Sequence, residues 1–448
     1  MHTTQSYRTL IIGLLKVSLP LIAVNLGFAG ITFADTVMAG RYSSTHLAAV
    51  AVASAVWYCI AFTLLGLFMA LSPITGQQVG AKKLETVKHY FQQAVWLAVL
   101  LALCLIVLVQ WYASTWLSWV NVEPAVRRLA AQYLQWIVWS SLFLLPSFCL
   151  RFVCEGLGNT RIVLQLAVIT LIINVIGNYL LVYGHWGLPE LGALGCAVAS
   201  VIAIASSTIV FVWLAARLPE IKSLNLWQGL PRPGFQLKYL RSFVAIGLPI
   251  AVSIFAEIGF FNIVVLLISP LGTTAISAHQ IALNYAGTLF MIPLGVSLGT
   301  TIMVSQHLGA GNRRAARQTG WLGIGLSAAI MSVSAISVML LRQPIAALYS
   351  NDPDVITLVL SLMGVAAMFQ LFDGIQVAAN GALRGYKDTT IPSIISVFCY
   401  WAVGFSFVYL MGIQRYASLM WVWYGFALSL TIASVMLISR FVITSRKA

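Results

Sequence analysis

The sequence predicts an all-α polytopic membrane protein with twelve transmembrane helices in two pseudo-symmetric six-helix bundles. The first observation is composition: 60% of the 448 residues are apolar and only 8% are charged, whereas a soluble domain carries about 25% charged residues. The second is a series of long apolar runs between short polar breaks, and the third is an internal repeat. This composition excludes a soluble enzyme, a disordered chain and a nucleic-acid-binding protein.

The apolar runs are long enough to cross a bilayer as helices, because a span needs about 20 mostly apolar residues. Transmembrane β-strands would instead alternate apolar and polar residues with a period of two. In chain order the runs predict helices over residues 9–39, 46–72, 90–112, 128–150, 162–183, 193–214, 241–269, 275–303, 318–341, 355–381, 391–412 and 418–440. The first run has no small-residue cleavage pattern, so we expect it to be retained as a span.

The longest connection lies between the sixth and seventh predicted spans. It contains Leu218-Pro219-Glu220 and Leu230-Pro231-Arg232-Pro233-Gly234, and such proline-containing stretches are typical of linkers. The sequence therefore predicts an N-terminal lobe over residues 1–214, a cytoplasmic linker over residues 215–240 and a C-terminal lobe over residues 241–448.

The basic residues are distributed unequally between the two sides of the predicted membrane. Of the 25 Lys and Arg residues, 20 lie on the side of both termini, and five lie on the other side: Arg41, Arg127, Arg128, Arg342 and Arg415. Because positive residues are retained in the cytoplasm, we expect both termini to be cytoplasmic. The same asymmetry explains the net charge of +14 without a polyanionic partner.

The chain also repeats itself at an offset of 229 residues. The marks that align without a gap are Leu19-Pro20 with Leu248-Pro249, Thr45 with Thr274, Gly66 with Gly295, Gln77, Gly80 and Ala81 with Gln306, Gly309 and Ala310, and Gly156 and Thr160 with Gly385 and Thr389. A constant offset over so many positions indicates a duplication. Since each half has an even number of spans, we expect parallel repeats with a substrate cavity between them.

No motif for catalysis or metal binding is visible in the sequence. It has no HExxH, no Asp-rich metal box and no nucleotide-binding loop, and its six histidines have no ligand spacing. Its six cysteines form no CxxC pair, which leaves a disulfide scaffold or a zinc site without support. We therefore expect no enzyme, no metal site and no cofactor.

Two paired motifs resemble those of the multidrug and toxic compound extrusion (MATE) transporters. The first pair is Gln77-Gln78-Val79-Gly80-Ala81-Lys82 and Gln306-His307-Leu308-Gly309-Ala310-Gly311, and the second is Glu155-Gly156-Leu157-Gly158-Asn159-Thr160 and Leu383-Arg384-Gly385-Tyr386-Lys387-Asp388-Thr389. Asp35 with Asn174 and Asn178 resembles the DinF-like branch of the family. The resemblance implies two lobes in a V shape and cation-driven export of drugs, many of them cationic.

Three of the 11 acidic residues lie inside predicted spans: Asp35, Glu257 and Asp373. An acid at the bilayer centre costs about 2.5–3.5 kcal/mol, so such residues usually have a function. We expect the basic residues, including Arg151 and Arg384, to lie in the connections rather than at this depth. Each acid must then be protonated, bound to a cation or solvated in a cavity.

Asp35 and several polar residues are expected at a similar depth in the N-terminal lobe. At 1.5 Å per residue, Asp35 and Asn178 each lie ~8 Å from the outer ends of their spans, Ser200 ~10 Å and Asn174 ~14 Å. Asn174 and Asn178 are four residues apart and share a helix face. The family resemblance implies a cation or proton site there, which we assign to Asp35, Asn174, Asn178 and Ser200. Asparagines also join neighbouring helices, which is the alternative interpretation.

The coupling ion and the second lobe leave alternatives open. Some relatives carry a second Asp at the position of Asn178, and one carboxylate fewer weakens a site for a hard cation such as sodium; this favours protons. Glu257 and Asp373 have counterparts in the sodium-dependent branch of the family, where they face the C-terminal lobe. They form either a second cation or cavity site or a buried structural pair. Pro20 removes one backbone hydrogen bond, so we expect it to let the first span bend.

Together these features predict a secondary active multidrug exporter with Asp35 as its coupling carboxylate. It would exchange an inward-moving proton, or sodium, for an amphiphilic organic cation by alternating access. We expect a monomer in the inner (plasma) membrane of a bacterium, with no nucleic-acid partner. The rival hypotheses are a lipid-linked oligosaccharide flippase of the same superfamily, which would need basic residues in its cavity, and a membrane enzyme, which would need a catalytic cluster.

Overall fold

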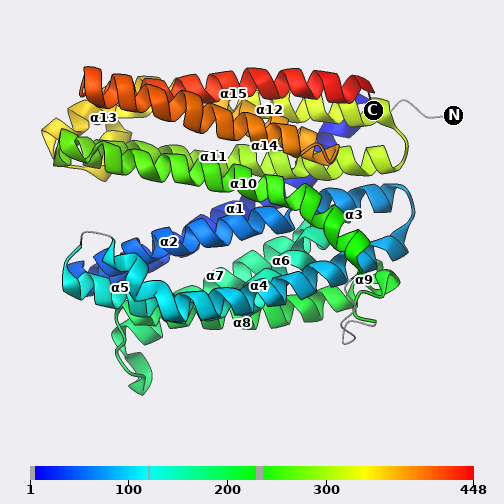
Figure 1. Ribbon diagram of the computed structural model, residues 1–448, viewed down its shortest axis with the longest axis horizontal. Coiled ribbons are helices and arrows are strands. Elements are labelled where there is room, and N and C mark those ends of the chain that lie inside the picture. The colour runs from blue at the N-terminus through cyan, green and yellow to red at the C-terminus, as the bar shows by residue number, and fades with distance from the viewer. Residues whose placement is uncertain (1–5, 120–121, 229–235, 448) are drawn as a thin grey trace. The chain divides into compact units, whose positions relative to one another are not determined.

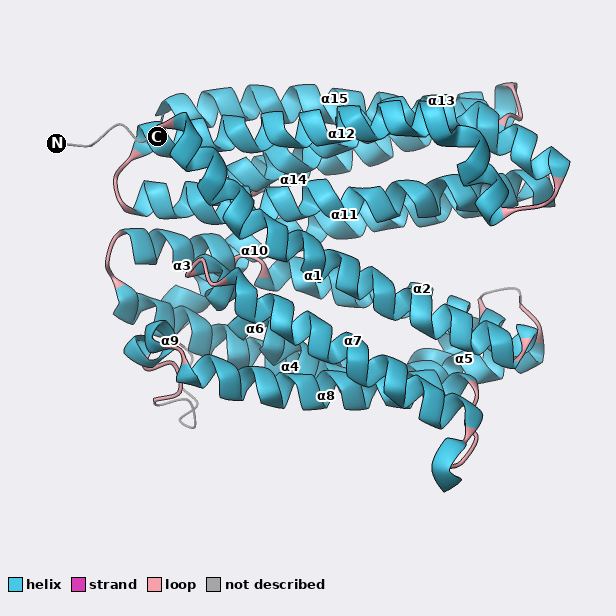
Figure 2. Cartoon of the chain, turned by 180° about the vertical axis from the view of Figure 1, so that it is seen from behind, coloured by secondary structure: helices cyan, strands magenta, loops and turns pink. Residues whose placement is uncertain are grey.

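The computed structural model describes residues 6–119, 122–228 and 236–447. Within these ranges every regular element is a helix, and no strand is present (Figures 1 and 2). The proline-containing stretch expected at residues 230–234 lies outside the described residues.

The first half of the chain forms helices that follow the predicted apolar runs in order. They are α1 (Tyr7–Tyr42), α2 (Ser44–Phe68), α3 (Leu71–Gly80), α4 (Leu84–Ser118), α5 (Pro124–Ile137), the short 3-10 helix η1 (Val138–Ser140), α6 (Ser141–Gly156), α7 (Thr160–Tyr183), the 3-10 helix η2 (His185–Gly187), α8 (Ala193–Arg217) and α9 (Pro219–Leu224). The short helix α9 lies in the segment predicted as a linker.

The second half has the same order of long helices. They are α10 (Leu237–Leu267), the 3-10 helix η3 (Ser269–Leu271), α11 (Thr273–Gly309), α12 (Arg313–Tyr349), α13 (Pro353–Gly385), α14 (Thr390–Val397), the π-helical segments η4 (Phe398–Phe405) and η5 (Val408–Arg415), and α15 (Leu419–Lys447). In the C-terminal half, α14, η4 and η5 together make up one span.

The prediction of twelve spans is confirmed, because 12 helices of the described chain are long and apolar enough to cross a membrane. Most are longer than the predicted runs: the ninth covers Arg313–Tyr349 instead of residues 318–341. Hydropathy detects the part of a helix that suits the hydrocarbon core, whereas polar turns continue the helix beyond it. For the same reason Gln77 and Gln306, which follow the predicted runs 46–72 and 275–303, lie in the last turns of α3 and α11.

The chain divides into two compact units, Ala23–Gly247 and Met1–Ile22 with Leu248–Ala448. Two helices therefore contribute to both units. The first turns of α1, up to Ile22, pack with the C-terminal half of the chain, and α10 passes into that unit only after Gly247. Both changes of unit occur within two residues of the paired prolines, Pro20 and Pro249, which lie inside continuous helices.

Each unit has its own buried core and close helix contacts. In the unit Ala23–Gly247 the core includes Trp57 and Tyr133, from α2 and α5. In the other unit, hydroxyl groups join α11 to α13: Ser297 Oγ donates to Val377 O over 2.6 Å, and Thr301 Oγ1 donates to Gly381 O over 2.7 Å. Small residues and such hydrogen bonds hold helices together in a membrane. Apolar side chains contribute less there, because they are surrounded by apolar groups whether they contact lipid or another helix.

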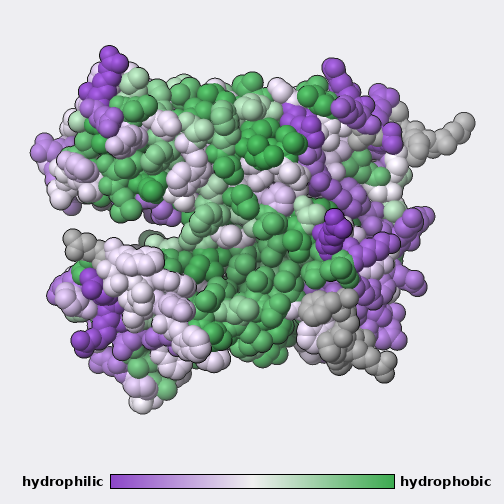
Figure 3. All heavy atoms as spheres, in the orientation of Figure 1, coloured by the Kyte–Doolittle hydropathy of each residue, from purple (hydrophilic) through white to green (hydrophobic). Residues whose placement is uncertain are grey.

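The surface of each unit is suited to a bilayer. On the face drawn in Figure 3, hydrophobic residues cover the middle of each helical bundle, and hydrophilic residues gather at the ends of the helices. Many large apolar side chains are exposed, among them Leu266 and Leu340 at more than 70%. In a membrane protein these side chains face lipid tails.

Candidate functional site

Asp35 lies in the part of α1 that belongs to the unit Ala23–Gly247, and its side chain is only 3% exposed. No proline or polar run interrupts α1 after Pro20, so the helix carries Asp35 into the core without a break. The carboxyl Oδ1 accepts a hydrogen bond of 2.6 Å from Nδ2 of Asn178 on α7.

The structure brings the other predicted residues of this site to the same place. Asn178 Nδ2 also donates to Asn174 Oδ1 over 3.2 Å, one turn away on α7. Asn174 Nδ2 in turn donates to Ser200 Oγ of α8 over 3.0 Å. One buried hydrogen-bonded chain thus runs across α1, α7 and α8, made of Asp35, Asn178, Asn174 and Ser200. Asn178 Oδ1 is a buried acceptor that has no partner among the described residues.

Three further residues around Asp35 were not predicted from the sequence. Tyr58 of α2 and Tyr133 of α5 lie within electrostatic range of the Asp35 carboxyl. Cys196 Sγ is 3.9 Å from the backbone oxygen of Asp35. The position of Cys196 could have been predicted, because it precedes Ser200 by four residues and therefore lies on the same helix face. No comparable sequence pattern relates the two tyrosines to Asp35.

The Asp35 carboxyl has no ion-pair partner among the described residues. The ion pairs found there join Arg151 to Glu155 and Arg440 to Asp388. The same part of the chain contains no group of three or more His, Cys, Asp or Glu side chains arranged to hold a metal ion. A negative charge on Asp35 is therefore balanced only by hydrogen bonds, unless a proton or a cation binds.

Glu257 and Asp373 come together in the other unit. Asp373 of α13 is buried, Glu257 of α10 is partly exposed, and the two lie within electrostatic range of each other. A side-chain hydrogen bond links Tyr400 to Glu257, and Gln376 Nε2 donates to the Tyr400 hydroxyl over 3.1 Å. This arrangement is polar but separate from the chain of residues around Asp35.

Two arginines that were expected in connections lie within helices instead, which corrects that expectation. Arg384 is in the last turn of α13, within electrostatic range of Glu257, and its buried Nη1 has no hydrogen-bond partner in the described ranges. Arg151 is inside α6 and pairs with the fully buried Glu155 over 2.8 Å. The physical reason is helix length, because both helices continue past the apolar runs that define the predicted spans.

A family model described as MatE matches the chain twice, over residues 20–180 and 249–410. The chain belongs to the MatE family. The two matches fall on the two halves of the repeat and leave the segment between residues 180 and 249 unmatched. Assignment to the DinF-like branch stays a prediction.

The fold of this MatE-family chain is also that of solved transporters. A mutant of the MATE transporter VcmN of Vibrio cholerae has a TM-score of 0.90 at 16% identity, with 99% of this chain and 98% of that chain covered. The eukaryotic MATE transporter AtDTX14 has a TM-score of 0.87 at 20% identity, with 98% of each chain covered. A MOP superfamily transporter from Pyrococcus furiosus has a TM-score of 0.87 at 15% identity, with 100% of this chain and 99% of that chain covered.

The motifs that resemble the family form four turns of one kind. After α3, α6, α11 and α13, an amide donates to the carbonyl five residues earlier: Lys83 to Gln78, Asn159 to Cys154, Asn312 to His307 and Asp388 to Leu383. The residue before each donor has a left-handed backbone: Lys82, Gly158, Gly311 and Lys387. This is the Schellman arrangement that ends a helix sharply, so the MatE motifs have a structural role at four equivalent helix ends.

Proposed function

We propose that this protein is a secondary active multidrug exporter that exchanges an inward-moving proton for an outward-moving amphiphilic organic cation. The observation that carries the proposal is the state of Asp35. Its carboxyl is buried, hydrogen-bonded to Asn178 and without an ion-pair partner among the described residues. Because an uncompensated charge within a bilayer is costly, proton binding stabilises this site. Asp35 is the proposed coupling carboxylate.

The amide of Asn178 is suited to both protonation states of Asp35. An ionised carboxylate only accepts hydrogen bonds, and Nδ2 of Asn178 donates to it. A protonated carboxyl gains a donor, and Oδ1 of Asn178 is a buried acceptor with no partner in the part of the chain that the structure describes. Rotation of the amide presents this oxygen to the new hydroxyl. Protonation then exchanges one hydrogen-bonding pattern for another and removes a charge from the unit.

Sodium is the alternative coupling ion, and the same residues bear on it. The carboxyl of Asp35, the amide oxygens of Asn174 and Asn178 and the hydroxyl of Ser200 are oxygen ligands of the kind that hard cations prefer. The site has one carboxylate, however, and its side-chain nitrogens are directed at Asp35 and Ser200. This arrangement favours a proton in the proposed mechanism.

The flippase alternative requires basic groups free to bind a pyrophosphate. Arg151 is already paired with Glu155 over 2.8 Å, and Arg384 lies within electrostatic range of Glu257. The pairing of the buried Arg151 with an acid supports the export of cations over the binding of an anionic lipid. We further propose a monomer in a bacterial plasma membrane with both termini in the cytoplasm, in keeping with the charge asymmetry of the loops.

The test is transport by the purified protein in lipid vesicles, with ethidium as the organic cation. An imposed pH gradient should drive ethidium transport in the absence of sodium. Asp35→Asn should fold and bind ethidium but transport it at background rates, because an amide does not titrate. Wild-type rates in Asp35→Asn would remove Asp35 as the coupling group, and transport that needs sodium but no pH gradient would contradict proton coupling.

A further inference from the structure

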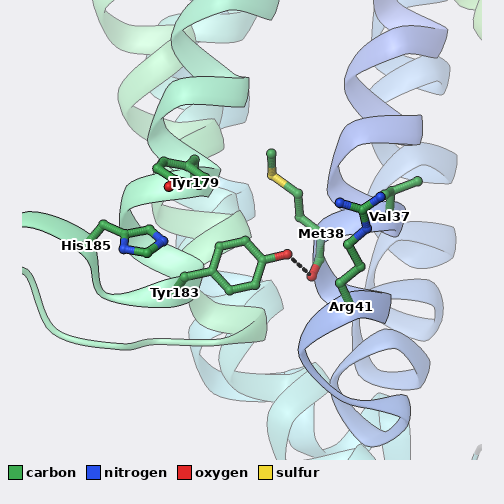
Figure 4. A pocket seen from close by; sticks show the side chains of 6 residues that line it. All are labelled: Val37, Met38, Arg41, Tyr179, Tyr183 and His185. Atoms are coloured by element: carbon green, nitrogen blue, oxygen red, sulfur yellow. Dashed lines mark hydrogen bonds between the residues drawn. The ribbon is translucent and has the colours of Figure 1, made fainter.

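A pocket of about 410 Å³ lies at the end of α1 and α7 that the proposed topology places outside the cell. It is lined by Val37, Met38, Arg41, Tyr179, Tyr183 and His185, all within the unit Ala23–Gly247 (Figure 4). The ring of His185 stacks on that of Tyr179, with centroids 4.4 Å apart. The six side chains come from only two long helices and the short helix η2 that follows α7.

The pocket is next to the Asp35 site along both helices. Met38 follows Asp35 by three residues and Arg41 follows it by six, which places them ~4.5 Å and ~9 Å further out along α1. On α7, Tyr179 directly follows Asn178, and Tyr183 lies ~7.5 Å beyond Asn178. The pocket therefore lies further out than the carboxyl–amide pair along the same two helices, and the pair itself is closed off, since Asp35 is 3% exposed.

A hydrogen bond joins α7 to α1 at this pocket, further out along both helices than the Asp35–Asn178 bond. The hydroxyl of Tyr183 donates to the backbone oxygen of Met38 over 3.1 Å, and Figure 4 shows the ring of Tyr183 extending from α7 to α1. Its position on α1 is between Asp35 and Arg41. A path from this end of the helices to Asp35, running between α1 and α7, passes this bond.

The pocket and the surroundings of Asp35 differ in the charged groups that they contain. The pocket contains one guanidinium, Arg41, and one imidazole, His185, and Glu190 hydrogen-bonds to the neighbouring Tyr42. Beyond Tyr183, Asp35 faces Asn174 and Asn178 of α7, Ser200 and Cys196 of α8, Tyr58 of α2 and Tyr133 of α5, none of them a basic residue. A proton can pass along imidazole, hydroxyl and water, whereas a hydrated metal cation must pass the charge of Arg41.

We propose that this pocket is the vestibule through which external protons reach Asp35, and that Tyr183 is its gate. The proposal rests on the proposed coupling role of Asp35 and adds the route and the gating residue. In the closed form the Tyr183–Met38 bond holds α1 against α7 on the outer side of the Asp35 carboxyl. Because one such bond has a modest net strength, its loss should increase the open fraction roughly three- to tenfold.

Cys196 provides a reporter of this route that does not depend on transport. Its sulfur is buried and lies 3.9 Å from the Asp35 backbone oxygen. In a variant that keeps only this cysteine, a small charged methanethiosulfonate reagent is applied from outside to intact cells, and the rate of modification is measured. Tyr183→Phe should raise that rate roughly three- to tenfold. Tyr179→Phe, which keeps the Tyr183–Met38 bond, is the matched control and should leave the rate unchanged.

A second variant acts in the opposite direction. Val37→Trp fills the pocket, so it should slow modification of Cys196 and lower proton-driven export, while melting temperature and ethidium binding stay at wild-type values. If neither Tyr183→Phe nor Val37→Trp alters the modification rate in folded protein, the vestibule is not the route. The result for Asp35→Asn reports on coupling alone, so failure of the route and failure of the proposed function give different outcomes.

Discussion

At the scale of single residues, the number of carboxylates beside Asn178 decides which ion the site prefers. Asn178→Asp would place a second carboxylate 2.6 Å from Asp35, where the amide nitrogen now donates. Two neighbouring carboxylates repel each other, and a hard cation relieves the repulsion by binding both. We expect this variant to lose export driven by a pH gradient alone and to recover it when sodium is added.

The measurement is ethidium transport at a fixed pH gradient over a series of sodium concentrations. Asn178→Ser is the control, because it removes the amide without adding a charge and should not respond to sodium. A sodium response in the wild type equal to that of Asn178→Asp would show that the second carboxylate does not decide ion choice.

Glu257 and Asp373 allow a second test at this scale. The double variant Glu257→Gln, Asp373→Asn keeps the size of both side chains and removes both charges. We expect a partial loss of export, since these groups also help to shape the polar region around Tyr400 and Gln376. The rate is measured at equal protein levels, with a substitution of the exposed acid outside the spans, Glu220→Gln, as the control. Near-normal transport would assign the pair a structural role.

At the scale of elements, the four equivalent turns differ in one respect that affects stability. The left-handed position is a glycine in two turns, Gly158 and Gly311, and a lysine in the other two, Lys82 and Lys387. A side chain in this conformation costs about 1–2 kcal/mol, a cost that glycine does not carry. Lys387 is also half-buried, and burial lowers its pKa to about 8, whereas Lys82 is exposed.

We therefore expect Lys82→Gly to raise stability by about 1 kcal/mol and Lys387→Gly to raise it by more at pH 7. The Lys387 amine has a lower pKa in the folded protein than the ordinary value of about 10.4, so its burial destabilises the fold below pH 8, and the penalty disappears as the pH rises from 8 to about 10.4. Melting temperatures in detergent at pH 7 and pH 10 measure this. An equal gain for both variants at both pH values would contradict the argument.

At the scale of the whole molecule, the orientation in the membrane follows from charge. The side that carries both termini holds 20 of the 25 Lys and Arg residues, so Lys82, Lys83, Arg313 and Arg314 are expected in the cytoplasm. A cysteine at any of these positions should react with a membrane-impermeant reagent only after the cells are opened, whereas one at Arg127 should react in intact cells. Reaction of a cysteine at Lys82 or Arg313 in intact cells would refute the orientation.

The sequence by itself determined the features of this protein that depend on local composition. Twelve apolar runs predict twelve spans because hydropathy and helix length are local properties, and the offset of 229 residues indicates the duplication. The same reasoning located Asp35 among apolar residues and placed Asn174 and Asn178 on one helix face. These inferences need only the period of a helix and the cost of a charge in lipid.

Only the tertiary structure decided which side chains meet. The Asn178–Asp35 bond joins residues 143 positions apart, and the neighbourhood of Glu257 and Arg384 depends on how far α13 extends beyond its apolar run. The passage of α1 and α10 between units and the Tyr183–Met38 bond are likewise absent from any local pattern. The physical reason is that burial and hydrogen-bond partners depend on how helices pack against each other, and packing joins residues that no sequence period relates.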